Sequence, residues 1–215
     1  MSSLQAAERG EPVLLQEARR SLAESLPQVA AQKLTRLLAD PDLPPDDRET
    51  ATLVLARALL AAGRIAEALE LVDPSTTGGR AEAELLRAEI LVSARRWAEA
   101  LPLFQSLAEH PEAAASARFG EAETLHALGR TDEAVKVLEA FVKTEPASNF
   151  ARLRLVGLLV ETSAIKKARK ILSAMTPATP EEVRWREYLE GRILLMEDHA
   201  APALAQFEAL LREPE

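Results

Sequence analysis

The sequence contains no cysteine, and it has few aromatic residues and few glycines. The absence of cysteine excludes disulfide bonds and thiolate metal sites. Aromatic residues make up 4% of the chain, and the runs of Val, Ile, Thr and Tyr that favour strands are missing. Instead Ala, Leu, Glu and Arg dominate, and these residues lose little conformational freedom in a helix. The composition therefore predicts an all-α protein.

The chain also lacks a long apolar run and a secretory signal pattern. Its longest apolar run, ATLVLARALLAAG at 51–63, is interrupted by Arg57 and falls short of the roughly 20 residues that span a bilayer. The polar first residues, SSLQAAERGEP, contain no basic segment followed by an apolar one. We therefore expect no membrane span, and a cytoplasmic location by default or a periplasmic one if a leader has been removed. The chain contains 20 Arg and only 6 Lys, and such a preference for Arg is typical of GC-rich bacterial genomes.

Positive charge is in deficit, because the net charge is −8 and the sequence pI is about 5.1. An acidic surface repels phosphate backbones, so we expect no nucleic acid partner. One exception is the run IKKARK, in which Lys166, Lys167, Arg169 and Lys170 fall within five positions. A solvated helix face is the simpler interpretation of this run, and a contact for an acidic partner or a lipid headgroup is the alternative.

Motifs that carry chemistry are missing as well. The sequence contains no GxGxxG, GxxxxGK[ST], HExxH or GxSxG pattern. Glu123 and His126 form a single ExxH, whereas di-iron bundles use two such motifs. The segment 78–80, GGR, before a helix is more simply a turn than an anion site. We therefore expect no catalytic activity, no metal and no cofactor.

A repeated pattern organises the chain. The stretch RRWAEALPLFQSLAEHP at 95–111 carries the set Trp97, Ala100 and Phe104, and an equivalent set returns 34 residues later at Thr131 and again at Ile165. A period of this length is typical of stacked helical hairpins, because a two-helix unit cannot bury its own apolar face. We expect about six hairpins in one domain over 11–215, after a flexible lead at 1–10. A compact bundle is the alternative, although it would not need this register.

Apolar periodicity and turn residues give the expected helix bounds. The helices are expected at about 11–26, 27–38, 46–62, 64–72, 80–94, 96–109, 112–128, 131–144, 147–162, 164–175, 180–196 and 200–212. Gly63 and Gly129 fall at turns inside hairpins, where a left-handed residue can end a helix. The polar segment 73–80 is expected to be a loop. The segment 179–182, TPEE, is a capping box with proline in the first turn.

These features resemble the tetratricopeptide repeat family, whose 34-residue unit is a helix–turn–helix. The second helices match best, at Ile65-Ala68-Val72, Trp97-Ala100-Phe104, Thr131-Ala134-Leu138, Ile165-Ala168-Leu172 and Ala200-Ala203-Phe207. First helices have the small residue the family prefers at Ala56, Ala88, Ala122 and Gly191, and a departure at Val156. The resemblance covers about 11–213 and implies a right-handed α-solenoid that acts as a protein-interaction scaffold.

In this family the first helices line a concave groove, and the register implies which residues face it here. The predicted groove residues are Arg57, Leu85, Glu89, Phe119, Glu123, Phe150, Leu153, Trp185, Tyr188 and Arg192, together with Leu53, Leu60, Val92, His126, Val160 and Leu195. Aromatic and arginine side chains in a concavity are typical binding anchors. We predict that a peptide or helix of a partner protein binds there. The alternative for each residue is packing between adjacent first helices.

Two other functions stay open at this point. The last helix, ALAQFEALLRE, presents an apolar face with Leu204, Phe207 and Leu211, whereas solenoids usually end in a polar cap. The end helices could therefore associate to form dimers or longer arrays. The chain could instead be the regulatory arm of a larger protein.

Overall fold

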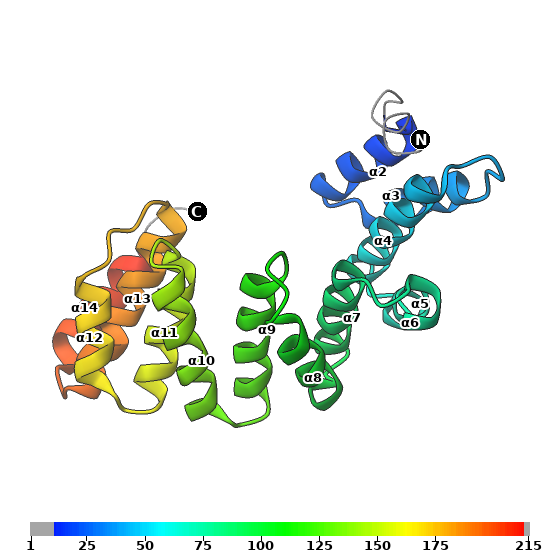
Figure 1. Ribbon diagram of the computed structural model, residues 1–215. Coiled ribbons are helices and arrows are strands. Elements are labelled where there is room, and N and C mark those ends of the chain that lie inside the picture. The colour runs from blue at the N-terminus through cyan, green and yellow to red at the C-terminus, as the bar shows by residue number, and fades with distance from the viewer. Residues whose placement is uncertain (1–10, 213–215) are drawn as a thin grey trace. The chain divides into compact units, whose positions relative to one another are not determined.

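The computed structural model describes residues 11–212, and the described residues form helices and no strands (Figure 1). The helices are α2 (Val13–Ala23), α3 (Pro27–Leu38), α4 (Pro45–Ala61), α5 (Ile65–Leu71), α6 (Pro74–Thr77), α7 (Ala81–Ser93), α8 (Trp97–Leu107), α9 (Ala114–Ala127), α10 (Thr131–Thr144), α11 (Asn149–Glu161), α12 (Ile165–Ser173), α13 (Pro180–Met196) and α14 (Ala200–Arg212). Apart from the short α6, they pack as consecutive antiparallel pairs. The predictions of an all-α fold and of helical hairpins are confirmed. The lead predicted at 1–10 lies outside the described residues.

The chain divides into two compact units, Met1–Ala113 and Ala114–Glu215, which we call unit 1 and unit 2. Unit 1 contains the hairpins α2/α3, α4/α5 and α7/α8, and unit 2 contains α9/α10, α11/α12 and α13/α14. The single domain predicted for 11–215 stays a prediction.

The small residues of the repeat pattern lie where helices meet most closely. On the second helices, Ala68, Ala100, Ala134, Ala168 and Ala203 are completely buried. On the first helices, Ala56, Ala88 and Ala122 are also completely buried, and Gly191 is buried as well. A larger side chain at these positions would hold the paired helices apart, because protein interiors are close-packed. The 34-residue register therefore reflects the packing of each hairpin.

Every hairpin turns through one residue in the left-handed conformation. This residue is Gly63 (φ 76°) and Gly129 (φ 77°) in two hairpins, and Ser25, Arg95, Ser163 and Asp198 in the other four. In all six, the next N–H donates to a carbonyl five residues back, as in Arg64 N to Leu59 O at 2.8 Å. This bond closes the end of the first helix. The turn positions predicted for Gly63 and Gly129 are confirmed.

The segment 73–80 differs from its prediction as a loop, because it contains the one-turn helix α6. Asp73 caps this helix by accepting a hydrogen bond from Ser75 N at 3.0 Å, and Pro74 occupies the first helical position. Proline is well placed there because its missing N–H would have no partner within the helix. The preceding helix, α5, has only 7 residues.

Candidate functional site

Three consecutive first helices of unit 2 contribute a row of aromatic side chains, which we call the aromatic strip (Phe119, Phe150, Trp185 and Tyr188). The Phe119 ring of α9 lies 4.9 Å from the Phe150 ring of α11, measured between centroids. The Phe150 ring in turn lies 5.4 Å from the Trp185 ring of α13, at an interplanar angle of 63°. Tyr188 follows one turn later on α13. The structure therefore brings together the four aromatic residues that the sequence assigned to the groove.

The strip combines contact between helices with open surface. Phe119 and Trp185 are half-buried, whereas Phe150 is 54% exposed and Tyr188 is 45% exposed. Aromatic pairs at such distances contribute about 0.5–1.5 kcal/mol beyond their buried area, so they help to hold the helices side by side. Phe150 and Tyr188 nevertheless keep about half of their surface available for other contacts.

Arg192 and Phe207 fix the position of Tyr188. The Arg192 guanidinium carbon lies 6.0 Å from the centre of the Tyr188 ring. The Phe207 ring of α14 also lies 6.0 Å from the Tyr188 ring, measured between centroids. A cation near an aromatic face is attracted by the ring quadrupole. The Tyr188 ring is therefore held in place although nearly half of it is exposed.

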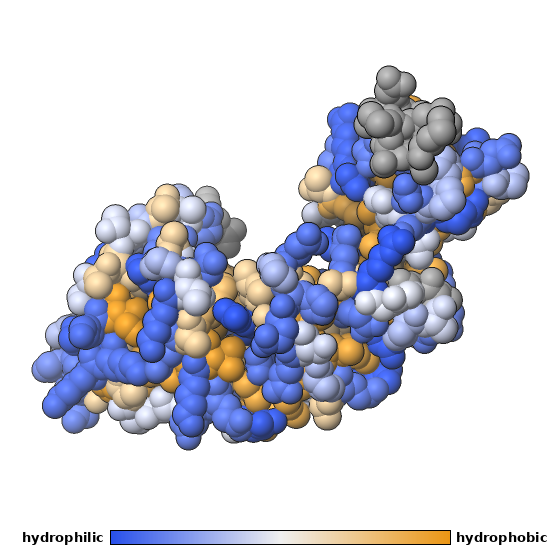
Figure 2. Space-filling model, in the orientation of Figure 1, coloured by the Kyte–Doolittle hydropathy of each residue, from blue (hydrophilic) through white to orange (hydrophobic). Residues whose placement is uncertain are grey.

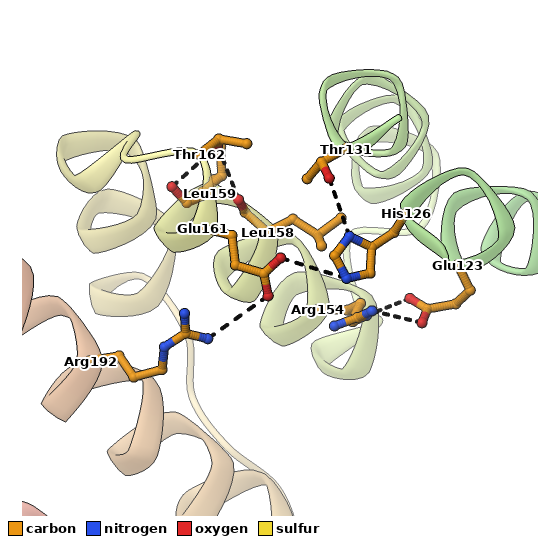
Figure 3. A network of polar contacts seen from close by, with 9 residues as sticks. All are labelled: Glu123, His126, Thr131, Arg154, Leu158, Leu159, Glu161, Thr162 and Arg192. Carbon is orange, nitrogen blue, oxygen red and sulfur yellow. Dashed lines mark hydrogen bonds and ion pairs between the residues drawn. The ribbon is translucent and has the colours of Figure 1, made fainter. Parts of the chain in front are cut away.

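Polar contacts also link the same three first helices (Figure 3). Arg154 of α11 donates from Nη2 to Glu123 Oε2 of α9 at 2.8 Å and from Nε to the other carboxylate oxygen. Glu161 of α11 bridges two helices, because its carboxylate lies 3.6 Å from His126 Nε2 and 4.0 Å from Arg192 Nη1 (Figure 3). The contacts join α9 to α11 and α11 to α13.

Some predicted residues have a different role in the structure. Leu153 is completely buried and Val160 is 2% exposed, so they belong to the core and do not line an open surface. The 34-residue register places Leu153 opposite Phe119, but Phe119 contacts Phe150, one turn earlier. Sequence reasoning missed Arg154 and Glu161. The sequence did contain a signal for Arg154, because its charge is opposite to that of Glu123. The two residues are 31 positions apart, the same separation as between Phe119 and Phe150.

Unit 1 has a hollow of about 490 Å³ on its first helices. Its lining residues are Arg19, Leu22, Thr50, Leu53, Val54, Arg57 and Glu82. Arg57 Nη2 lies 3.6 Å from Glu82 Oε1, and Arg19 Nη1 lies 3.0 Å from Glu11 Oε1. Both arginine side chains are about half exposed. The lining therefore combines two half-exposed guanidinium groups with the Glu82 carboxylate and apolar side chains, and a guanidinium group suits an acidic or polar ligand group.

The other predicted groove residues of unit 1, Leu60 on α4 and Leu85, Glu89 and Val92 on α7, lie outside the lining of this hollow. Leu85 is half-buried and Glu89 is exposed. Partial burial nevertheless raises the pKa of the Glu89 carboxyl, and the positive charge of Arg57 opposes this rise. Of the predicted set in unit 1, only Arg57 and the largely buried Leu53 line the hollow.

The basic run on α12 is partly neutralised by acidic residues of neighbouring hairpins. Lys167 pairs with Glu139 of α10, and Arg169 pairs with Glu197 at the end of α13. Lys166 and Lys170 are exposed. Two of the four cations therefore tie α12 to its neighbours, which leaves a weaker positive patch than the sequence suggested.

Over residues 11–212, no three His, Asp or Glu side chains lie close enough together to hold a metal ion. No helix in that range has both the length and the apolar character required to cross a bilayer.

Comparisons with known proteins give a family match and several structural matches. The model of the family described as "Tetratricopeptide repeat" matches residues 15–73 and 85–151. PilF from Pseudomonas aeruginosa matches with a TM-score of 0.72 at 15% identity, over 93% of this chain and 89% of that chain. MamA from Desulfovibrio magneticus RS-1 matches with a TM-score of 0.60 at 15% identity, over 76% of this chain and 94% of that chain.

YrrB, described as a TPR protein with an unusual peptide-binding site, matches with a TM-score of 0.53 at 16% identity, over 97% of this chain and 98% of that chain. No curated protein matches the sequence. At these identities the structural matches show a shared fold.

Proposed function

Because the chain belongs to the tetratricopeptide repeat family, we propose that it is a scaffold whose first helices bind a peptide or a helix of a partner protein. The family resemblance inferred from the sequence is confirmed, and membership implies protein–protein interaction. The proposal assigns no catalytic activity, in keeping with a family whose members are typically scaffolds. We propose that the binding surface is the aromatic strip of unit 2.

The observation that carries this proposal is the exposure of two anchored aromatic rings. Phe150 and Tyr188 are 54% and 45% exposed, although neighbouring helices hold both rings in position. A side chain that is already ordered loses little conformational entropy when a partner covers it. Large aromatic side chains of this kind often dominate the affinity of an interface. The strip thus provides two preorganised apolar contacts on adjacent helices.

Arginine side chains are proposed to fix the polar groups of the bound segment. Arg192 lies beside Tyr188, and its nearest carboxylate oxygen, on Glu161, is 4.0 Å away. Its donors are therefore not saturated by a short hydrogen bond to that carboxylate. In unit 1, Arg57 and Arg19 are proposed to bind an acidic side chain in the hollow of that unit. The structural likeness to YrrB, described as having a peptide-binding site, supports a peptide as the class of ligand.

Site-specific photo-crosslinking tests the proposed surface. A photoreactive phenylalanine analogue at position 188 or 150, in the source cell, should capture the same partner protein at both positions. The control position is Ser173, which is exposed on the second helix α12. If position 173 captured the same protein with equal yield, the aromatic strip would not be the binding surface. Failure to capture any protein at positions 188 and 150 would contradict the proposal as well.

Self-association is a second candidate, and a specific observation favours it. Besides Val183 and Tyr188, four apolar side chains of α13 and α14 are exposed, namely Leu195 (49%), Met196 (49%), Leu204 (59%) and Leu211 (86%). On the visible face of unit 2, apolar surface is interleaved with hydrophilic side chains (Figure 2). Light scattering over a hundredfold range of concentration separates the two functions. A monomer throughout the range would exclude self-association and leave the scaffold proposal standing.

A further inference from the structure

Unit 1 contains a second cavity, the α4–α5 cavity, which has a volume of about 550 Å³. Its wall is formed by the first turns of α4, the end of α5 and the segment that leads into α7. The lining includes Pro45, Thr52, Leu53 and Leu71 on these helices, and Gly78 beyond them. The volume falls in the range of about 300–1,000 Å³ that is usual for ligand sites.

The shortness of α5 explains this cavity. α4 has 17 residues, whereas its partner α5 has 7, a difference of about 15 Å of helix at 1.5 Å per residue. α5 stops because Asp73 precedes Pro74, and a residue before proline is disfavoured in helical conformation. The chain then turns into α6, so α5 runs beside only part of α4, while the first turn of α4 contacts α3 of the preceding hairpin. The α4–α5 cavity lies where α5 ends.

The α4–α5 cavity opens on a different face of α4 from the hollow described above. Pro45, Glu49 and Thr52 belong to the cavity, whereas Thr50, Val54 and Arg57 belong to the hollow. At about 100° per residue, the two sets lie about a third of a turn apart on the helix. Leu53 lies between these two sets and lines both, so the cavity adjoins the hollow but extends onto a face of α4 to which the proposed function does not refer.

The charges around the cavity indicate what it would bind. Arg80 pairs with Glu49, and Arg48 donates to the backbone carbonyls of Leu38 and Asp40 at 2.8 and 2.6 Å. Glu70 is exposed, and within the described residues it makes no hydrogen bond or ion pair. Among the described residues, Glu70 is thus the one charged lining group with neither a hydrogen bond nor an ion pair, whereas the Arg48 guanidinium is held by two backbone carbonyls.

The net charge of unit 1 has the same sign. Residues 1–113 contain 18 Asp and Glu against 12 Lys and Arg, so they carry six of the eight net negative charges of the chain. Long-range attraction would therefore favour a basic partner at this unit.

From these observations we propose that the α4–α5 cavity binds an apolar side chain of a partner protein that stands next to a lysine or arginine. The apolar side chain contacts Pro45, Leu53 and Leu71, and the neighbouring cation pairs with Glu70. The cavity would thus bind a basic group of the partner, whereas the arginine-lined hollow of the same unit is proposed to bind an acidic one.

Two short peptides test the proposal on the whole chain. Acetyl-Leu-Arg amide is the probe, and acetyl-Leu-Glu amide is the matched control. In two-dimensional NMR, the Leu-Arg peptide should shift the amide signals of Thr52, Leu71 and Gly78 in a saturable way, and the Leu-Glu peptide should not. Glu70→Gln should weaken the Leu-Arg peptide about two- to fivefold, the range expected for one exposed ion pair.

Glu109→Gln is the control variant, because Glu109 is exposed in the same unit and does not line the cavity. This variant should bind the Leu-Arg peptide as the wild type does. The proposal would be overturned if both peptides caused equal shifts or if neither caused a saturable shift. It would also be overturned if Glu70→Gln bound the Leu-Arg peptide with unchanged affinity. Shifts of the same signals on raising the protein concentration alone would also overturn it, in favour of a second copy of the chain.

Discussion

Replacing Gly191 and Gly157 by alanine should change the stability of unit 2 in opposite directions. Both glycines lie inside helices, where alanine is favoured over glycine by about 1 kcal/mol. A Cβ at Gly157 would lie 3.9 Å from Leu189 Cδ2, which is an ordinary contact. Gly157→Ala should therefore stabilise unit 2 by about 1 kcal/mol.

At Gly191 the same change meets the Phe207 ring. A Cβ there would lie 2.6 Å from Phe207 Cε1 and 2.8 Å from Cζ, so the ring must move. Overpacking of this kind costs about 1–3 kcal/mol, which outweighs or cancels the gain in helix propensity. The net effect of Gly191→Ala should be a loss of up to about 2 kcal/mol.

Urea denaturation followed by tryptophan fluorescence measures both changes. Trp97 lies in unit 1 and Trp185 in unit 2, so a Trp97→Phe background leaves a single reporter for unit 2. In a background that also carries Phe207→Ala, the loss caused by Gly191→Ala should disappear. If Gly191→Ala stabilised the chain as much as Gly157→Ala, the packing of α14 on α13 deduced here would be wrong.

Two further predictions concern unit 1. Arg95 has φ 58° at the turn position where Gly63 has φ 76°, and this left-handed conformation is costly for any residue other than glycine. Gly63→Ala should therefore lower the free energy of unfolding by about 1–2 kcal/mol, and Arg95→Gly should raise it by up to about 1 kcal/mol. Thermal melting checks both, and effects of the same sign would contradict the turn geometry. Burial raises the pKa of the Glu89 carboxyl above its value in the unfolded chain, so its contribution to stability is lost as pH rises through that raised pKa. Glu89→Gln should therefore raise the denaturation midpoint at pH 7 but not at pH 3, and equal shifts at both pH values would refute this sign.

The repeat register predicted the hairpins because it reflects packing within a hairpin. The small residues at Ala100 and Ala134, 34 residues apart, are both completely buried at the crossing of their helices. The turn at Gly129 was predictable for a similar local reason, since a left-handed residue ends the first helix there. These features depend on neighbours that lie close in the sequence.

Contacts between hairpins were harder to predict. The register placed Leu153 on the groove, but adjacent helices meet at an offset, so Phe119 contacts Phe150 instead and Leu153 enters the core. Arg154 reaches Glu123 with the same offset. The crossing of neighbouring helices depends on the side chains at the contact, which the repeat length does not encode. In the segment 73–80, the sequence did contain a signal for α6, because Asp73 and Pro74 suit the cap and first position of a helix.

The affinity of the crosslinked partner for a strip variant tests the scaffold account most directly. Calorimetric titration would compare the wild type with the double variant Phe150→Ala and Tyr188→Ala, and with Ser173→Ala on the exposed side of α12 as control. Loss of two anchor side chains should reduce the binding free energy by at least about 2 kcal/mol, or roughly thirtyfold in affinity, with the helix content unchanged. Ser173→Ala should bind as the wild type does. An intact affinity in a folded double variant would contradict the claim that the aromatic strip binds the partner.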